Sequence, residues 1–272
     1  MTMGKAKVTI LTPSYQQARY IEQNILSVLG QDYQPLEHIV VDGGSTDTTI
    51  DVLKKYPRLT WVSEKDEGQA DALDKGLKMA TGDIVGWINS DDYYLPNCIH
   101  SAVAAFEDSN VQWVVGNILI AYEAVGKTVR EKSPRVTYET LIADPDILRQ
   151  QATFFRRSFL EQAGSIDKSF HLVMDCDLWI RLAKLSPPKM VDEYWAVFRM
   201  QPEQKTSGRT LLRQLGEIQT ILSRERAPFF DQVRILSRKL VYYVKYRIKM
   251  ALIVAGLIDK AYSGAPYSIR HL

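Results

Sequence analysis

Four short apolar runs in the first third of the chain, separated by segments of helical spacing, restrict the fold more than any other feature. The runs cover 8–11, 38–41, 59–62 and 84–88 and have the length of buried strands. Residues 20–29 carry apolar side chains at helical spacing, and helices are also predicted up to Leu53 and over 70–79. This β-α-β-α-β-α-β order predicts an α/β fold with a mostly parallel sheet and helices on both faces.

Polar residues follow the end of every one of these runs. They lie at 12–15, 42–47, 63–69 and 89–92. In sheets of this kind, ligands bind outside the carboxyl ends of the strands. Four neighbouring strand ends with polar loops are a stronger indication of a ligand pocket than any one loop alone.

The pair Asp91 and Asp92 directly follows the apolar run 84–88. Two adjacent carboxylates at the end of a buried strand are costly unless a positive charge lies beside them. A divalent cation that carries a diphosphate would supply that charge, because magnesium and manganese take one or two carboxylates together with phosphate and water oxygens. Alone, the pair fits equally well a turn that leads into the helix opened by Pro96 and Asn97.

The loop that begins with Asp42-Gly43-Gly44 also has two interpretations. It is either a tight turn, or a site where Asp42 accepts hydrogen bonds from a base or ribose that the glycines allow to approach. It is not a phosphate-binding P-loop, since the Gly-Lys-Ser/Thr element is missing. Tyr15 either stacks on a nucleobase or covers the sheet edge, while Asp66 and Gln69 either line the same pocket or begin a solvated helix.

The second half of the chain mixes further strands with helices. Strands are expected over 113–120, 122–129, 153–155 and 191–200, with helices over 158–163 and 175–185. Asp175 and Asp177 stand at the start of the last helix, where one can cap it and the other can face a cleft as a general base. From Thr210 the pattern is helical, with no turn signal before Ser263.

Composition excludes several classes of protein. The 272 residues are 46% hydrophobic and 24% charged, which is typical of a soluble globular protein, and a net charge of +2 gives no nucleic-acid signature. With only Cys98 and Cys176, a disulfide framework or zinc site is not expected. The N-terminus leads directly into a strand, so we expect no signal peptide, and no apolar run reaches the about 20 residues that span a bilayer.

Residues 240–258 combine basic and aromatic side chains with an apolar end. Such a segment is either a helix packed on the rest of the protein or a helix on an anionic membrane surface. The expected location is therefore the cytoplasm, with peripheral attachment to the inner face of the cell membrane as the second interpretation.

Taken together, these motifs resemble family 2 glycosyltransferases of the glycosyltransferase-A fold. The resemblance covers about residues 6–206. It rests on Thr12-Pro13-Ser14-Tyr15, 41–47, 68–76, Asn89-Ser90-Asp91-Asp92, 150–157 and 174–179. It implies a single Rossmann-like catalytic domain at 1–208, with a nucleotide-binding half at 1–118 and an acceptor half at 119–208. Residues 209–272 would form a helical extension.

The resemblance also implies a role for each matching residue. Asp175 would be the catalytic base, and Asp91 and Asp92 would hold Mn²⁺ or Mg²⁺, with Asp92 as the expected direct ligand. The nucleotide would be bound by Thr12, Pro13, Tyr15, Asp42, Asp66, Gln69 and Asp91. Gln150, Asp177, Trp179 and Arg199 would contact the acceptor or support the base.

Several positions depart from the family pattern. Met174 stands where many members have Glu, Gln201 where related members often have His, and Asp74 where Asn is frequent. Gln cannot take the ionic role of that His toward a metal or diphosphate. The Gln-x-x-Arg-Trp signature of processive synthases is absent from the sequence, which favours transfer of a single sugar.

The expected function is transfer of a sugar, with inversion, from a nucleotide-diphosphate sugar to an acceptor hydroxyl. A UDP-sugar is the expected donor, and a lipid-linked or envelope saccharide is the expected acceptor. Two alternatives remain at this point. A nucleotidyltransferase would also use paired aspartates, although no glycine-rich basic loop follows the first strand, and a non-catalytic nucleotide-sugar-binding module would fit Met174 and Gln201.

Overall fold

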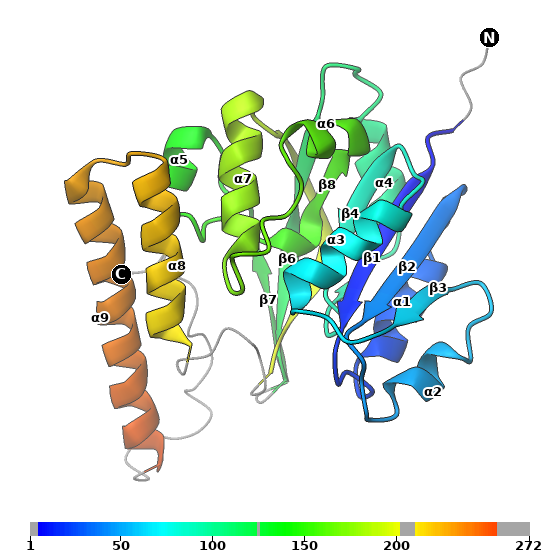
Figure 1. Cartoon of the computed structure of the whole chain (residues 1–272), viewed down its shortest axis with the longest axis horizontal. Helices are drawn as coiled ribbons and strands as arrows, with labels where there is room; N and C mark the ends of the chain where they lie inside the picture. The colour runs from blue at the N-terminus through cyan, green and yellow to red at the C-terminus, as the bar shows by residue number, and fades with distance from the viewer. Residues whose placement is uncertain (1–4, 124–125, 202–209, 255–272) are drawn as a thin grey trace.

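The computed structural model describes residues 5–123, 126–201 and 210–254, which form a mixed, mostly parallel sheet covered by helices on both faces (Figure 1). The sheet order is β3-β2-β1-β4-β8-β6-β9-β5, and β7 pairs with β6. The strands are β1 (Val8–Ser14), β2 (Leu36–Asp42), β3 (Thr60–Ser63), β4 (Ile84–Trp87), β5 (Tyr93–Tyr94), β6 (Trp113–Tyr122), β7 (Lys127–Glu131), β8 (Thr153–Arg156) and β9 (Lys189–Met200).

The first four long strands are mutually parallel, as the β-α-β pattern predicts. Beyond β4 the direction changes, because β8 is antiparallel to both of its neighbours, β4 and β6. Parallel pairing resumes between β6 and β9, and the short β5 pairs antiparallel with β9. The expected α/β fold with a mostly parallel sheet is confirmed.

Two helical layers follow from the alternation of side chains along the strands. The helices are α1 (Ile21–Leu29), α2 (Thr49–Leu53), α3 (Gln69–Met79), α4 (Cys98–Ala105), α5 (Tyr138–Ala143), α6 (Arg157–Gln162), α7 (Met174–Leu185), α8 (Leu211–Arg224) and α9 (Phe229–Val254), with a 3₁₀ turn at Gln150–Ala152. Leu11 of β1 packs in one apolar cluster with α3, α7 and α8, whereas its neighbour Ile10 packs in another with α1 and α4.

Close packing across the sheet leaves no space for a side chain at Gly116 in β6. A Cβ atom there would lie 2.4 Å from ring atoms of Trp195 in β9, far inside van der Waals contact. The ring of Trp195 is fully buried and its Nε1 donates to Ser101 Oγ in α4 at 3.0 Å. Gly116 therefore allows β9 to sit tightly against β6, directly before the strand end that reaches the pocket.

The C-terminal helices differ from the sequence prediction in one respect. The continuous helical pattern expected from Thr210 is wrong, since α8 ends at Arg224 and α9 begins at Phe229. Arg226 has a φ of +53°, and Pro228 lacks the N–H and the free φ that a helix interior requires. The two helices lie side by side, with α8 against α5 and α7 and α9 on the outside (Figure 1).

None of the helices in the described part of the chain is both long and apolar enough to cross a bilayer. The end of the segment 240–258 lies outside the described residues. The division of the chain into 1–208 and 209–272 remains a prediction.

Candidate functional site

A pocket of about 720 Å³ opens at the carboxyl ends of β1 and β4 and extends to the start of α7. Polar loops after β2 and β3 form one side, and the turn before β8 forms another. The pocket brings together seven of the site residues expected from sequence, which are Pro13, Tyr15, Asp66, Gln69, Asp91, Gln150 and Asp175. Thr12, Asp42, Asp92, Asp177, Trp179 and Arg199 lie behind this lining rather than in it.

The adjacent carboxylates after β4 occupy different environments. Asp91 lines the pocket, and its Oδ2 accepts a hydrogen bond from Gln201 Nε2 at 3.1 Å. Asp92 is 1% exposed, and its two oxygens accept hydrogen bonds from Arg199 N and Gln151 Nε2, both at 2.8 Å. Burial raises the pKa of both groups, and the charge of Asp91 raises the pKa of Asp92 further. Of the two carboxylates, Asp91 is thus the one that faces the pocket.

The donor atoms around Asp91 suit a hard cation that arrives with its own oxygen ligands. Gln201 Oε1 and Gln150 Oε1 are buried and have no hydrogen-bond partner among the described residues. The same part of the chain contains no group of three or more His, Cys, Asp or Glu side chains that could enclose a metal. Magnesium and manganese need only one or two protein carboxylates when phosphates and water complete the shell. These residues therefore fit a cation bound together with a diphosphate.

Asp42 and Thr12 hold the loops of the pocket in place. Asp42 is fully buried and accepts hydrogen bonds from Gly44 N, Ser45 N and Ser63 Oγ at 3.1, 2.8 and 2.7 Å. Thr12 is buried, with its Oγ1 3.2 Å from Asn24 Oδ1 and 2.9 Å from His38 Nε2. The side chains of Asp42 and Thr12 are thus used to fix the ends of β2 and β1. The residues next to them in the sequence form the pocket surface.

Tyr15 and Asp66 present the open side of the same pocket. The Tyr15 side chain is 60% exposed, which leaves its ring free to stack on a flat ligand. Asp66 lies against Gly43, where a Cβ would approach its Oδ2 to 2.7 Å. Burial raises the pKa of Asp66, and the charges of Asp71 and Asp42 raise it as well.

Asp175 lies at the start of α7 and lines the far end of the pocket. Its Oδ1 accepts a hydrogen bond from Cys176 N at 2.9 Å. Burial, followed by the nearby charge of Asp146, raises the pKa of Asp175 to about 6. A carboxylate with a pKa close to neutral pH is ionised at pH 7 yet basic enough to accept a proton in a reaction.

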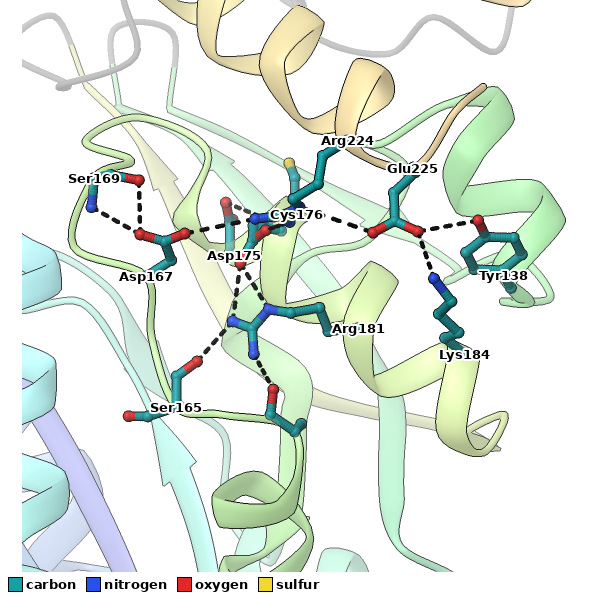
Figure 2. A network of polar contacts seen from close by, with 12 residues as sticks. Tyr138, Ser165, Asp167, Ser169, Asp175, Cys176, Arg181, Lys184, Arg224 and Glu225 are labelled. Carbon is teal, nitrogen blue, oxygen red and sulfur yellow. Dashed lines mark hydrogen bonds and ion pairs between the residues drawn. The ribbon is translucent and has the colours of Figure 1, made fainter. Parts of the chain in front are cut away.

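Asp177 and Trp179 support α7 without reaching the pocket. Asp177 is fully buried and pairs with Arg181 at 2.9 Å and with Arg224 of α8. Both arginines belong to the polar network of Figure 2. Trp179 stacks on Trp87 and Phe155, with ring centroids 5.5 and 5.4 Å apart. Trp179 thus holds the helix that carries Asp175 against the sheet, and Asp177 ties this helix to α8.

Arg199 also acts from behind the pocket. Its guanidinium pairs with Glu123 at 3.0 Å and lies over the rings of Tyr20 and Tyr93, at 4.8 and 5.3 Å from their centroids. Its backbone N–H is the group that holds Asp92. Arg199 thus joins β9 to the loop after β4.

Several polar pocket residues have no role predicted from the sequence, among them Lys65, Asp146, Gln151 and Gln214. Lys65 lies within the polar stretch 63–69, and Asp146 lies in a loop that had no assigned role. Gln151 directly follows Gln150, which the sequence does predict as a site residue. Gln214 had no local signal, because it belongs to a helix expected to lie outside the catalytic domain.

Comparison with known proteins gives a family match over most of this region. The model of glycosyl transferase family 2 matches residues 9–171. An uncharacterized glycosyltransferase of Rickettsia prowazekii is 25% identical over 97% of this chain and 91% of its own length. An uncharacterized glycosyltransferase of Nostoc is 30% identical over 47% of this chain, which spans only 41% of that relative. A putative teichuronic acid biosynthesis glycosyltransferase of Bacillus subtilis, TuaG, is 39% identical over 34% of this chain and 38% of its own.

Solved structures share the same fold. S. aureus TarS (1–349) in complex with UDP-GlcNAc matches with a TM-score of 0.64 and 19% identity, over 86% of this chain and 71% of that chain. The mannosyltransferase PcManGT from Pyrobaculum calidifontis, in complex with GDP-Man and Mn²⁺, matches with a TM-score of 0.61 and 21% identity, over 88% and 70%. The chain therefore belongs to glycosyltransferase family 2, and its fold is that of the glycosyltransferase-A structures.

Proposed function

We propose that this glycosyltransferase transfers a single sugar, with inversion, from a nucleotide-diphosphate sugar to an acceptor hydroxyl. One observation carries the proposal: Asp91 and Asp175, from distant parts of the chain, face the same pocket. One carboxylate can serve the leaving diphosphate and the other the attacking hydroxyl. A module that only binds a nucleotide sugar would not need the second carboxylate.

The nucleoside end of the donor would lie at the open side of the pocket. Tyr15 offers a ring for stacking, and Asp66 and Gln69 offer polar groups beside it. The two related structures are complexes with UDP-GlcNAc and with GDP-Man, which supports a nucleotide-sugar donor. A UDP-sugar is the donor we propose for this chain.

A divalent cation, Mn²⁺ or Mg²⁺, would be held by Asp91 together with the donor diphosphate. Gln201 Oε1 is the further oxygen next to Asp91 that has no hydrogen-bond partner in the described chain. The cation would neutralise the charge that develops on the diphosphate. Asp92, whose oxygens already accept two hydrogen bonds from the protein, would orient this loop instead of binding the cation directly.

Asp175 would act as the general base at the acceptor end. It would remove the proton from the acceptor hydroxyl while the oxygen forms a bond to the anomeric carbon. The bond from that carbon to the diphosphate would break on the opposite face, and the nucleoside diphosphate would leave with the bonding electrons. Gln150 and Asp146 also line the pocket, and Gln150 Oε1, which has no hydrogen-bond partner among the described residues, could accept from a sugar hydroxyl.

The test begins with a panel of nucleotide sugars and manganese in a thermal-shift assay, because a ligand that binds the native state raises its melting temperature. Transfer is then measured as release of nucleoside diphosphate. Asp175→Asn should abolish transfer and leave the ligand-induced shift unchanged. Full transfer by this variant would remove Asp175 from the mechanism, and release of pyrophosphate instead would favour a nucleotidyltransferase.

A lipid-linked or envelope saccharide is the acceptor class that we propose. The similarity to TuaG supports it, as does an apolar stripe on α9. Leu240, Val241 and Val244 are 48, 52 and 47% exposed there, close to the exposed Lys245. An apolar stripe bordered by basic side chains suits an anionic membrane surface.

Membrane binding is tested by flotation of the full chain with vesicles of phosphatidylglycerol and phosphatidylcholine. Val241→Glu combined with Val244→Glu should reduce flotation several-fold. The matched control is Leu26→Glu combined with Leu185→Glu, since these side chains are similarly exposed, at 53 and 49%, on other helices. Equal flotation of both double variants and the wild type would contradict the membrane proposal.

A further inference from the structure

Helix α8 supplies a carboxylate to the loop that leads into α7. Glu217 Oε2 accepts hydrogen bonds from three consecutive backbone N–H groups, those of His171, Leu172 and Val173, at 3.1, 2.8 and 3.3 Å. The Glu217 side chain is 12% exposed, and its other oxygen pairs with Arg213 at 3.1 Å.

This contact lies directly at the N-terminus of α7. Val173 is the N-cap residue of α7, and no side chain of its own provides a capping hydrogen bond. The first N–H groups of a helix and of the turn before it need acceptors, and a negative charge at this end is favoured by the helix dipole. Glu217 supplies an acceptor to the turn before α7 and to the N-cap residue Val173, and it places a negative charge at this end of the helix, from more than forty residues away in the sequence.

The capped loop is part of the pocket wall. Leu172, Met174 and Asp175 all line the pocket, and so does Gln214, which lies one turn before Glu217 in α8. On its inner face α8 buries Ile218, Ile221 and Leu222 completely, in the apolar cluster that also contains α7. A helix in the expected C-terminal extension is therefore built into the acceptor end of the site.

We infer that Glu217 is a positioning residue for the reaction, which holds the loop 171–173 so that Asp175 faces the acceptor hydroxyl. The inference rests on the proposed function, in which Asp175 is the base. Without the carboxylate, three neighbouring N–H groups lose their acceptor, and the loop must turn to find water. A displacement of about 1 Å of a reacting group can cost about a hundredfold in rate, whereas the donor end of the pocket is built on β1, β2 and β4 and would not move.

The decisive comparison uses three variants of the full chain. Glu217→Ala removes the acceptor. Glu217→Gln keeps an oxygen that the three N–H groups can reach. Arg213, which is 56% exposed, loses its ion pair in both variants and can turn toward water. Glu225→Ala is the matched control. Glu225 is also a carboxylate near the end of α8 that anchors α7 and α5, through Lys184 at 3.0 Å and Tyr138 at 3.1 Å, but at the opposite end of α7 (Figure 2).

The first measurement needs no ligand. Hydrogen exchange of the backbone amides at 171–173 should accelerate at least tenfold in Glu217→Ala, stay near the wild-type rate in Glu217→Gln, and be unchanged in Glu225→Ala. The second is steady-state transfer. We expect kcat to fall about tenfold to a hundredfold in Glu217→Ala, to recover to within about threefold in Glu217→Gln, and to stay within about twofold in Glu225→Ala. Binding of UDP and GDP, each with manganese, should be unchanged in all three.

The outcomes separate this inference from the proposed function. If the wild type releases no nucleoside diphosphate with any donor and acceptor, the proposed function fails, while the exchange data still show whether Glu217 holds the loop. If the wild type is active and Glu217→Ala keeps its kcat within twofold, the inference is overturned. It is also overturned if Glu225→Ala lowers kcat as much as Glu217→Ala, because the effect would then follow general loosening of α8.

Discussion

Replacing Asp175 by Asn should stabilise the protein at neutral pH while it removes the base. Burial and the neighbouring Asp146 raise the pKa of this carboxyl group from its ordinary value of 3.8 to about 6. Because the folded-state pKa lies above the unfolded value, ionisation favours the unfolded chain. The folded state is therefore destabilised once the pH exceeds 3.8, and the full penalty is present above about pH 6.

The size of the penalty follows from the two pKa values. At about 1.4 kcal/mol per pKa unit, the difference between 3.8 and about 6 corresponds to about 3 kcal/mol at most. Asp175 is half-buried, so water reduces this figure, and we expect about 1–3 kcal/mol. Asn keeps the oxygen that accepts from Cys176 N and removes the charge that faces Asp146. For a chain of this length the melting temperature should rise by about 3–10 °C at pH 7.5.

Asp177 gives a control of opposite sign, two residues along the same helix. Its carboxylate is fully buried between the guanidinium groups of Arg181 and Arg224. Asp177→Asn leaves these cations without their counter-charge and should cost about 2–4 kcal/mol, since Arg224 is partly exposed and can be hydrated. The same conservative substitution is thus expected to raise the melting temperature at one position and to lower it at the other.

Thermal unfolding of the two variants and the wild type at pH 7.5 and pH 5 measures both effects. At pH 5 the advantage of Asp175→Asn should fall to about half, because the folded wild type is then mostly protonated at Asp175. A variant less stable than the wild type at pH 7.5 would refute the reasoning. So would an advantage that does not change with pH, since it would not come from the charge.

Four further predictions concern the reaction and the packing. The transfer rate should fall about tenfold per pH unit below about pH 6, as Asp175 becomes protonated, and a pH–rate profile checks this limb. Asp91→Asn should abolish manganese-dependent donor binding with little loss of stability. By contrast, Asp92→Ala should also lower the unfolding free energy by about 1–3 kcal/mol, because Arg199 N and Gln151 lose their acceptor, as denaturant titrations would show. Gly116→Ala should cost about 1–3 kcal/mol or more through the clash with the ring of Trp195, with donor binding retained in the folded fraction.

The nucleotide-binding half of the fold was predictable because its signals are local. A strand that is buried on both faces of a parallel sheet has an unbroken run of apolar residues, as at 84–88. Each of these runs is followed directly by its polar loop. The insertion of β8 between β4 and β6 was not predictable in this way. The spacing of apolar residues shows that a segment is a strand, but it does not show which distant strand it pairs with. Pro228 does carry a local signal for the break between α8 and α9, although the apolar spacing on either side of it is helical.

The site was predictable in residue type more than in role. Each of the aspartates singled out lies at or behind the pocket, yet the sequence cannot show which oxygens are already bound. Asp92 is held by Arg199, 107 residues away, and Asp177 by Arg224, 47 residues away. Glu217 had no signal at all, because its acceptor role depends on how α8 docks against the loop before α7.

The two aspartate pairs share one physical arrangement. In each pair one carboxylate faces the pocket, Asp91 or Asp175, and its neighbour is buried and held by an arginine, through the backbone of Arg199 or the side chain of Arg224. The buried member fixes the element that presents the pocket-facing one. Loss of activity alone therefore cannot distinguish a ligand or base from its support. Only the pocket-facing member should combine lost activity with unchanged or increased stability, so both quantities must be measured for every substitution at this site.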